Sequence, residues 1–132
     1  MKTHVNFEIA KLLKEKGFEG SKSPLFYYKD GTLHKTPTGG YKGLKCWNTW
    51  EATQGVRWDA PTIVEVVMWL YEKHGIWISV LMENNEEDNV SFYFSITKNV
   101  NNETYFIIRK SNFKSPTEAY EAAITHTLEK LI

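Results

Sequence analysis

The chain has little of what would cross-link it or hold it in a membrane. Cys46 is the single cysteine among 132 residues, so no internal disulfide can form, which suits a reducing compartment. No apolar run approaches the ~20 residues that span a bilayer. The first residues, Met1 to Asn6, contain no apolar segment of a secretory signal. We therefore expect a cytoplasmic protein that has no association with a membrane.

The chain also has no net charge at pH 7, because its 16 Lys and Arg side chains balance its 16 Asp and Glu side chains. The balance is uneven along the chain. Residues 1–59 carry ten basic and six acidic side chains, whereas residues 60–132 carry six basic and ten acidic ones. A surplus of positive charge in the first part would suit an anionic partner.

Residues 60–132 carry the clearest pattern of secondary structure. Thr62 and Glu65 have the spacing of a capping box, and Gly75 is typical of a helix end. The apolar periodicity predicts a helix, three strands joined as an antiparallel meander, and a final helix. The predicted elements are Ile63 to His74, Ile76 to Glu83, Val90 to Thr97, Thr104 to Lys110, and a helix opened by Ser115 that runs to the C-terminus.

Alternation along the first two strands predicts which face is buried. Ser91 and Ser95 fall on the wetter face of the second strand, and Leu81 falls on the corresponding face of the first. The residues expected to face the core are Ile76, Ile78, Val80, Met82, Val90, Phe92, Phe94 and Ile96.

Residues 1–59 predict a helix over Phe7 to Lys16, capped by Asn6, and a hairpin over Phe26 to His34. Asp30-Gly31 suits a type I′ turn in that hairpin. Residues 36 to 59 are too aromatic for a linker, so we expect an ordered covering loop with a short strand around Lys45 to Trp50. The fold class is therefore α+β, in one domain over residues 1–132, with an α-β-β-β-α unit at 60–132.

Three stretches of the chain resemble small phage- and prophage-encoded proteins of unassigned activity. They are the segment from Phe7 to Phe18, the segment from Ala60 to Ile76 and the tail from Phe113 to Ile132. These are capping and packing motifs. The resemblance to phage-encoded proteins implies an accessory protein in the cytoplasm of a bacterial host. Because the shared motifs are capping and packing motifs, the resemblance implies no particular chemistry.

The order of elements after Thr62 also resembles that of the double-stranded-RNA-binding domain. The alanines of the last helix, Ala119, Ala122 and Ala123, are similar to that family's alanine-rich helix. The family's phosphate-gripping lysines are replaced here by Pro116, Thr117 and Tyr120. In addition, its first hairpin loop is replaced by the acidic run from Asn84 to Asn89. The resemblance implies the topology without the usual RNA site.

The sequence contains no recognisable catalytic or metal-binding constellation. The acidic loop Glu83 to Asp88 lacks the ligand spacing of an EF-hand, so a solvated hairpin loop explains it better than a metal site. Cys46 and the four histidines match no known spacing of nucleophile or ligands. His74 suits the C-terminal end of its helix. We expect no cofactor and no metal, and the sequence leans against an enzyme.

Two aromatic regions leave alternatives open. Lys42 and Lys45, with Tyr41 and Trp47, would allow a nucleic-acid contact by charge and stacking, although a turn leading into core-covering aromatics is the favoured interpretation. Trp77, Tyr93 and Tyr105 form either an exposed aromatic row on the outer sheet face or a face covered by residues 1–59.

Met68 and Trp69 lie away from the main apolar stripe of their helix, which runs through Ile63, Val66 and Leu70. Exposed apolar side chains of this size mark contact sites. The leading prediction is a non-catalytic module that binds another protein, or a second copy, through Met68 and Trp69. The alternative is a nucleic-acid-binding module that uses the basic, aromatic N-terminal half.

Overall fold

The computed structural model describes residues 3–19, 21–35, 58–84 and 89–132. The chain forms two compact units, one of His4–Thr62 and one of Met1–Thr3 with Ile63–Ile132. Both contain helix and antiparallel sheet, so the α+β class is confirmed. The second unit takes in Ile63–Ile132, which is the part of the single predicted domain where the sequence places the α-β-β-β-α order. The expected short strand around Lys45 to Trp50 lies outside the described residues.

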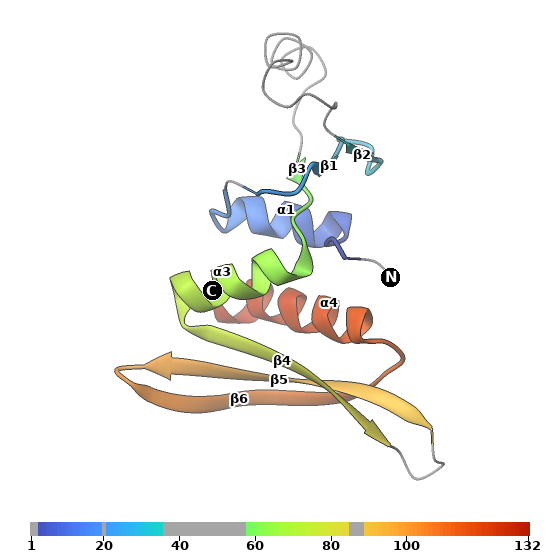
Figure 1. Cartoon of the computed structure of the whole chain (residues 1–132). Coiled ribbons are helices and arrows are strands. Elements are labelled where there is room, and N and C mark those ends of the chain that lie inside the picture. Colours follow the sequence, from blue (N-terminus) through green and yellow to red (C-terminus); the bar gives the residue numbers. More distant parts are fainter. Residues whose placement is uncertain (1–2, 20, 36–57, 85–88) are drawn as a thin grey trace. The chain divides into compact units, whose positions relative to one another are not determined.

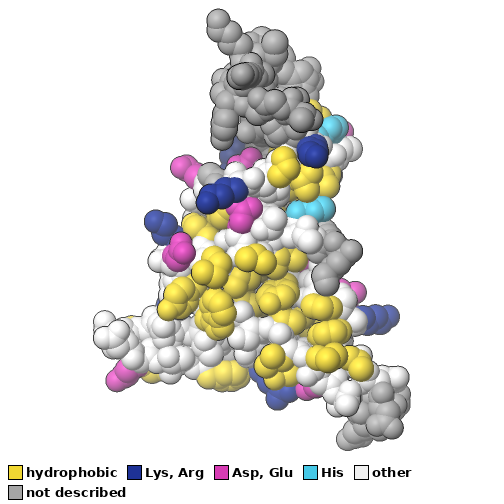
Figure 2. Space-filling model, in the orientation of Figure 1, with side chains coloured by type: hydrophobic (Ala, Val, Ile, Leu, Met, Phe, Trp, Pro, Cys, Tyr) yellow, Lys and Arg dark blue, Asp and Glu magenta, His cyan; other side chains and the backbone are white. Residues whose placement is uncertain are grey.

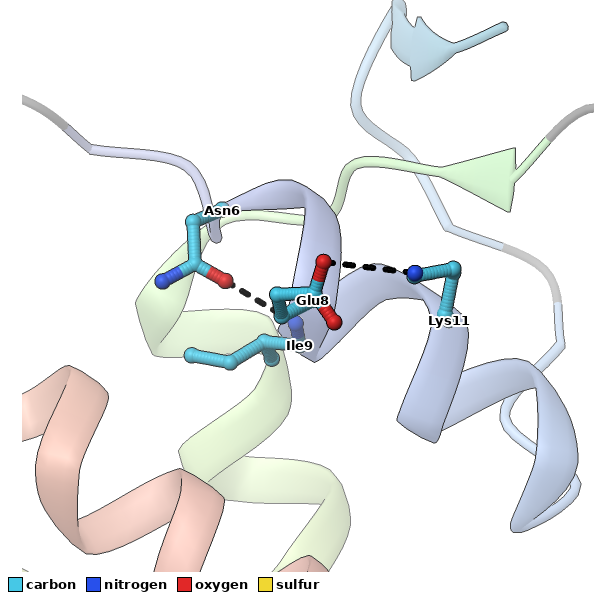
Figure 3. Close-up of polar contacts among 4 residues, drawn as sticks. All are labelled: Asn6, Glu8, Ile9 and Lys11. Carbon is cyan, nitrogen blue, oxygen red and sulfur yellow. Dashed lines mark hydrogen bonds and ion pairs between the residues drawn. The ribbon is translucent and has the colours of Figure 1, made fainter. Parts of the chain in front are cut away.

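The N-terminal unit begins with helix α1, Phe7–Glu15. The Asn6 side chain accepts a hydrogen bond from the backbone N–H of Ile9 over 2.9 Å, which satisfies one of the free donors of the first turn (Figure 3). Gly17 follows the helix with φ +89°. Ile9 and Leu13 are buried, as the apolar stripe predicts. The predicted cap and C-terminal glycine are therefore confirmed.

A small sheet completes this unit in the order β2-β1-β3. Its strands are Leu25–Tyr27 (β1), Leu33–Lys35 (β2) and Trp58–Asp59 (β3). The β1–β2 turn is not the predicted type I′. Gly31 has φ +86°, but Asp30 stays outside the left-handed region, because its carboxylate accepts hydrogen bonds from the N–H and hydroxyl of Thr32. This gives a three-residue loop that ends in a left-handed glycine.

The C-terminal unit has the predicted α-β-β-β-α order (Figure 1). Its helices are Ile63–His74 (α3) and Pro116–His126 (α4), and α4 continues into a π-helical turn at Thr127–Leu131. The strands are Ile76–Asn84 (β4), Val90–Val100 (β5) and Glu103–Phe113 (β6). They form an antiparallel meander in the order β4-β5-β6. Both helices lie on one face of this sheet (Figure 1), and we call the opposite face the outer face.

Local signals fix the corners of this unit. Gly75 ends α3 with φ +66°, and its carbonyl accepts the N–H of Asn99 over 2.8 Å, which joins the corner to β5. Asn101 and Asn102 both have positive φ, at 52° and 66°. The two-residue β5–β6 turn therefore has the backbone signature of type I′, the geometry that the sequence placed at Asp30-Gly31. Ser115 caps α4 through a bond from the Glu118 N–H.

Strand β6 departs from simple alternation at two points. The pairing with β5 is interrupted between Ile96 and Thr97, where β6 inserts Ile107, and again between Phe92 and Phe94. The second irregularity lies near Asn112, which has φ +72°. An extra residue in a strand reverses the faces of those beyond it.

The core of the C-terminal unit follows the predicted faces only in the part of the sheet under the helices. Its buried apolar residues are Ile63, Val66, Val67, Leu70, Ile76, Ile78, Phe94, Ile96, Ala119, Ala123, Ile124 and Leu128. Met82 and Val90, predicted to face the core, are exposed, and Phe92 is half-buried. The prediction fails there because the β4–β5 hairpin extends past the helices (Figure 1).

Candidate interaction surface

The structure separates the two residues on which the predicted contact rests. Met68 is 42 % exposed. Trp69 is half-buried, and its ring meets His74 edge-on with centroids 5.0 Å apart. Successive residues of a helix are rotated by about 100°, so the two side chains leave α3 on different flanks. Met68 and Trp69 therefore do not form one patch.

Met68 belongs instead to a second apolar stripe on α3. Val64 and Tyr71 share its flank at i, i+4 and i+7 spacing, and both are exposed, Val64 to 71 %. The buried stripe of the same helix contains Val66 and Leu70. Helix α3 therefore carries a second apolar stripe that the core of its own unit does not bury.

The second stripe continues onto strand β4. The rings of Tyr71 and Trp77 meet edge to face, 5.6 Å apart, and Trp77 is exposed on the outer face. Leu81 follows on the same face of β4 and is 53 % exposed. We call Val64, Met68, Tyr71, Trp77 and Leu81 the α3/β4 surface. Figure 2 shows hydrophobic side chains gathered over this part of the molecule.

The sequence offered a signal for this surface that simple inspection of Met68 and Trp69 missed. Val64, Met68 and Tyr71 are spaced as one helical stripe, beside the core stripe. Leu81 was correctly expected on the face away from the core. The contact between Tyr71 and Trp77 could not be predicted, because it depends on how tightly Gly75 turns the chain.

The predicted aromatic row on the outer face is only partly present. Trp77 pairs with Thr97, and Thr97 pairs with Phe106, so Phe106 lies on the outer face beside them. Tyr105 pairs with Lys98, whose other neighbour is the buried Ile76, and so belongs to the helix-covered side of the sheet. The insertion of Ile107 causes this exchange of Tyr105 for Phe106.

Charged groups occupy the centre of the outer face. Arg109 lies over the Tyr93 ring, 4.1 Å from its centroid, and forms an ion pair of 2.8 Å with Glu83. This arrangement uses the positive charge of Arg109 within the sheet, which weakens the face as a platform for nucleic-acid bases.

Tyr105, on the other side of the sheet, donates a 2.6 Å hydrogen bond to Glu103, and this bond raises the pKa of the Tyr105 hydroxyl.

The residues predicted for a nucleic-acid contact, Tyr41, Lys42, Lys45 and Trp47, lie outside the described residues, as does Cys46. In the described part of the N-terminal unit, lysines pack on aromatic rings of the same unit. Lys11 lies 4.6 Å from the centroid of Phe7, and Lys14 lies 5.9 Å from that of Trp58. Lys11 also pairs with Glu8 over 3.2 Å (Figure 3).

One polar cluster has the residue types of a catalytic triad. Thr32 Oγ1 lies 2.6 Å from Asp30 and 2.7 Å from His34 Nε2. In a working triad the hydroxyl gives its proton to the histidine. Here the Thr32 hydroxyl lies between the Asp30 carboxylate and the His34 ring, whereas in a triad the histidine lies between the carboxylate and the hydroxyl. The hydrogen bonds from Thr32 lower the pKa of Asp30. The cluster is explained as a turn network.

A metal-binding cluster and a membrane-spanning helix are both absent from the described residues. They contain no group of three or more His, Cys, Asp or Glu side chains that could hold a metal ion. The acidic residues 85–88 lie outside them. Among the described helices, none has the length and apolarity needed to cross a membrane.

Comparisons with protein-family models, with curated proteins and with solved structures gave no match to this chain.

Proposed function

We propose that the chain is a non-catalytic module that binds another protein through the α3/β4 surface. The observation that carries this proposal is the second apolar stripe of α3, with Val64, Met68 and Tyr71 exposed beside Trp77. Contiguous exposed apolar side chains of this kind mark contact sites. Aromatic and methionine side chains are enriched at the centres of interfaces. Of the two residues predicted from sequence, Met68 stays in the contact and Trp69 flanks it.

The proposal includes the setting that the sequence resemblance implies. The chain would act as an accessory protein of a phage or mobile element in the cytoplasm of a bacterial host. The support for this setting is the resemblance of the Phe7 to Phe18, Ala60 to Ile76 and Phe113 to Ile132 segments to phage-encoded proteins.

Site-specific photo-crosslinking in cells that express the protein tests the contact. A photoreactive amino acid at Met68 should give covalent protein adducts. The same group at Lys73 should give none, because Lys73 is exposed on the same helix about 140° away from Met68. Equal labelling from both positions, or no protein adduct from Met68, would reject the proposed surface.

A nucleic-acid-binding module remains the second candidate, because residues 1–59 carry four more basic than acidic side chains. Lys42 and Lys45 would supply phosphate contacts, and Tyr41 and Trp47 would stack on bases. For double-stranded RNA we expect only non-specific binding, weaker than about 10⁻⁶ M at physiological salt. The reason is that Pro116, Thr117 and Tyr120 replace the phosphate-binding lysines. A titration with nanomolar, length-dependent affinity would instead favour this second candidate.

A further inference from the structure

The two edges of the β4-β5-β6 sheet differ in how they are protected. Strand β6, at one edge, carries two interruptions in its pairing, together with Arg109 and Lys110. Bulges and positive charges are the usual devices that keep an edge strand from pairing with another chain. Strand β4, at the other edge, has an unbroken register from Ile76 to Asn84 and contains no proline, lysine or arginine.

The second half of strand β4 is also exposed to solvent on both faces of the sheet. Leu81 on the outer face is 53 % exposed, and Met82 on the opposite face is 65 % exposed. In the part of the chain that the structure describes, the backbone of residues 77–84 forms hydrogen bonds with β5 and with no other segment. An edge strand of this length with apolar side chains on both faces is a template for a further strand.

We infer that a second copy of this chain pairs with β4, antiparallel, to form a continuous six-stranded sheet in a two-fold symmetric dimer. In the register centred on Leu81, each Leu81 lies opposite its counterpart, and Val80 lies opposite Met82. Glu83 lies opposite Ser79. Near the axis this register joins apolar to apolar side chains, further out it places Asn84 opposite Ile78, and it places no like charges opposite each other within residues 78–84. The dimer rests on the proposed function and names the partner of that surface.

A second copy fits this edge because the two ends of β4 are complementary. At one end α3 carries the exposed stripe of Val64, Met68 and Tyr71, beside Trp77. At the other end the helix-side face is uncovered at Met82 and Val90. Antiparallel pairing about a two-fold axis brings the uncovered end of each copy alongside the α3 helix of the other. The protected β6 edges then stop further growth, so the assembly closes as a dimer.

Sedimentation equilibrium of the full chain tests the inference. We expect a dissociation constant of about 1 µM for the dimer, which is a binding free energy of about 8 kcal/mol. At about 100 µM protein, the wild-type chain should therefore have a molecular mass of twice the 15.4 kDa of the monomer. Leu81→Lys should raise the dissociation constant at least about tenfold, because it places two ammonium groups at the two-fold axis. Phe106→Lys is the matched control, since Phe106 is exposed to 65 % on the same face at the other edge, and it should leave the dimer intact.

Hydrogen exchange on the wild-type protein supplies a readout that needs no substitution. Those amides of residues 77–84 that point away from β5 should gain protection as the protein concentration rises, whereas those of β6 should not. A wild-type chain that stays monomeric, or a dimer dissociated by Phe106→Lys and not by Leu81→Lys, overturns the inference. Adducts to a different protein from Met68, with a monomeric chain, would reject the dimer and keep the proposed function. An absence of any Met68 adduct would reject the function itself.

Discussion

Tyr71 at the end of α3 meets Trp77 at the start of β4 edge to face, with ring planes at 83°. The two rings join the exposed stripe of the helix to the outer face of the sheet around a single glycine corner. Both side chains remain exposed, so their contact organises a surface and adds little to the core.

A double-mutant cycle measures this contact. Edge-to-face aromatic pairs contribute about 0.5–1.5 kcal/mol beyond the area that they bury, so Tyr71→Ala and Trp77→Ala should show a coupling of that size in urea unfolding. Trp69→Ala paired with Trp77→Ala is the control, because Trp69 leaves α3 about 160° around the helix from Tyr71, which meets Trp77, so the coupling there should be near zero. Additive effects for Tyr71 and Trp77 would show that their contact does not form in solution.

The core prediction concerns strand β5. Phe94 is fully buried, so Phe94→Ala should lower the free energy of unfolding by about 3–5 kcal/mol, whereas Phe92→Ala should cost less because Phe92 is half-buried. Ser95→Ala should be nearly silent. Thermal and chemical denaturation of the three variants gives the comparison, and a Phe92 variant less stable than the Phe94 variant would contradict it.

Ser91 gives a sharper test of the same strand. It was expected on the wetter face, but its side chain is buried, and among the described residues its hydroxyl finds no hydrogen-bond partner. A buried hydroxyl without a partner costs stability. Ser91→Ala should therefore be neutral or stabilise the fold by up to about 1 kcal/mol. A clear loss of stability in chemical denaturation would mean that the hydroxyl is paired in solution.

The α3–β4 corner depends on Gly75. A Cβ at this position would lie 2.9 Å from the carbonyl oxygen of Asn99, and φ is +66°. Gly75→Ala should therefore destabilise the protein by about 1–3 kcal/mol, because the clash adds to the cost of left-handed backbone. Gly17→Ala is the matched control: it has a positive φ but no neighbour within 4 Å of its Cβ, and its loss of stability should be smaller. Equal losses in the two variants would show that the Asn99 carbonyl moves freely.

The β1–β2 turn should respond to acid. Hydrogen bonds from Thr32 lower the pKa of Asp30 below its ordinary value of 3.8. The carboxylate therefore stabilises the turn above that value, and the contribution is lost as the pH falls through the lowered pKa. The Thr32 amide resonance should follow this titration in an NMR series. Asp30→Asn keeps a side-chain oxygen acceptor but has no proton to gain, so its Thr32 amide should not titrate in the same range.

The sequence predicted the elements well wherever a cap or a glycine marks the joint. Helix α3 runs from Ile63 to His74 as predicted, because Gly75 ends it and apolar residues recur on its buried face. Helix α4 begins at Pro116 after its Ser115 cap for the same reason. Such signals act within a few residues, so they can be found without knowing the tertiary structure.

The candidate surface was less predictable, because its exposure depends on features that local spacing does not decide. Alternation alone could not show that helix coverage ends before Met82 and Val90. Asp30-Gly31 has the composition of a type I′ turn, yet the Asp30 carboxylate bonds to Thr32 and selects another geometry. Met68 was found correctly as an exposed residue. Val64 and Tyr71 share its helical spacing in the sequence, but only their burial shows that this second stripe is exposed.

The extra residue at Ile107 makes strand β6 tolerant of a change in its length at this point. With Ile107 inserted between the pairs Ile96–Ile108 and Thr97–Phe106, Tyr105 lies on the same side of the sheet as Ile76. Deleting Ile107 would place these two pairs next to each other and restore even alternation. Tyr105 would stay opposite Lys98 and Phe106 opposite Thr97, so neither side chain would change face. A single-codon deletion could thus straighten the strand and leave every other side chain on the face that it occupies now.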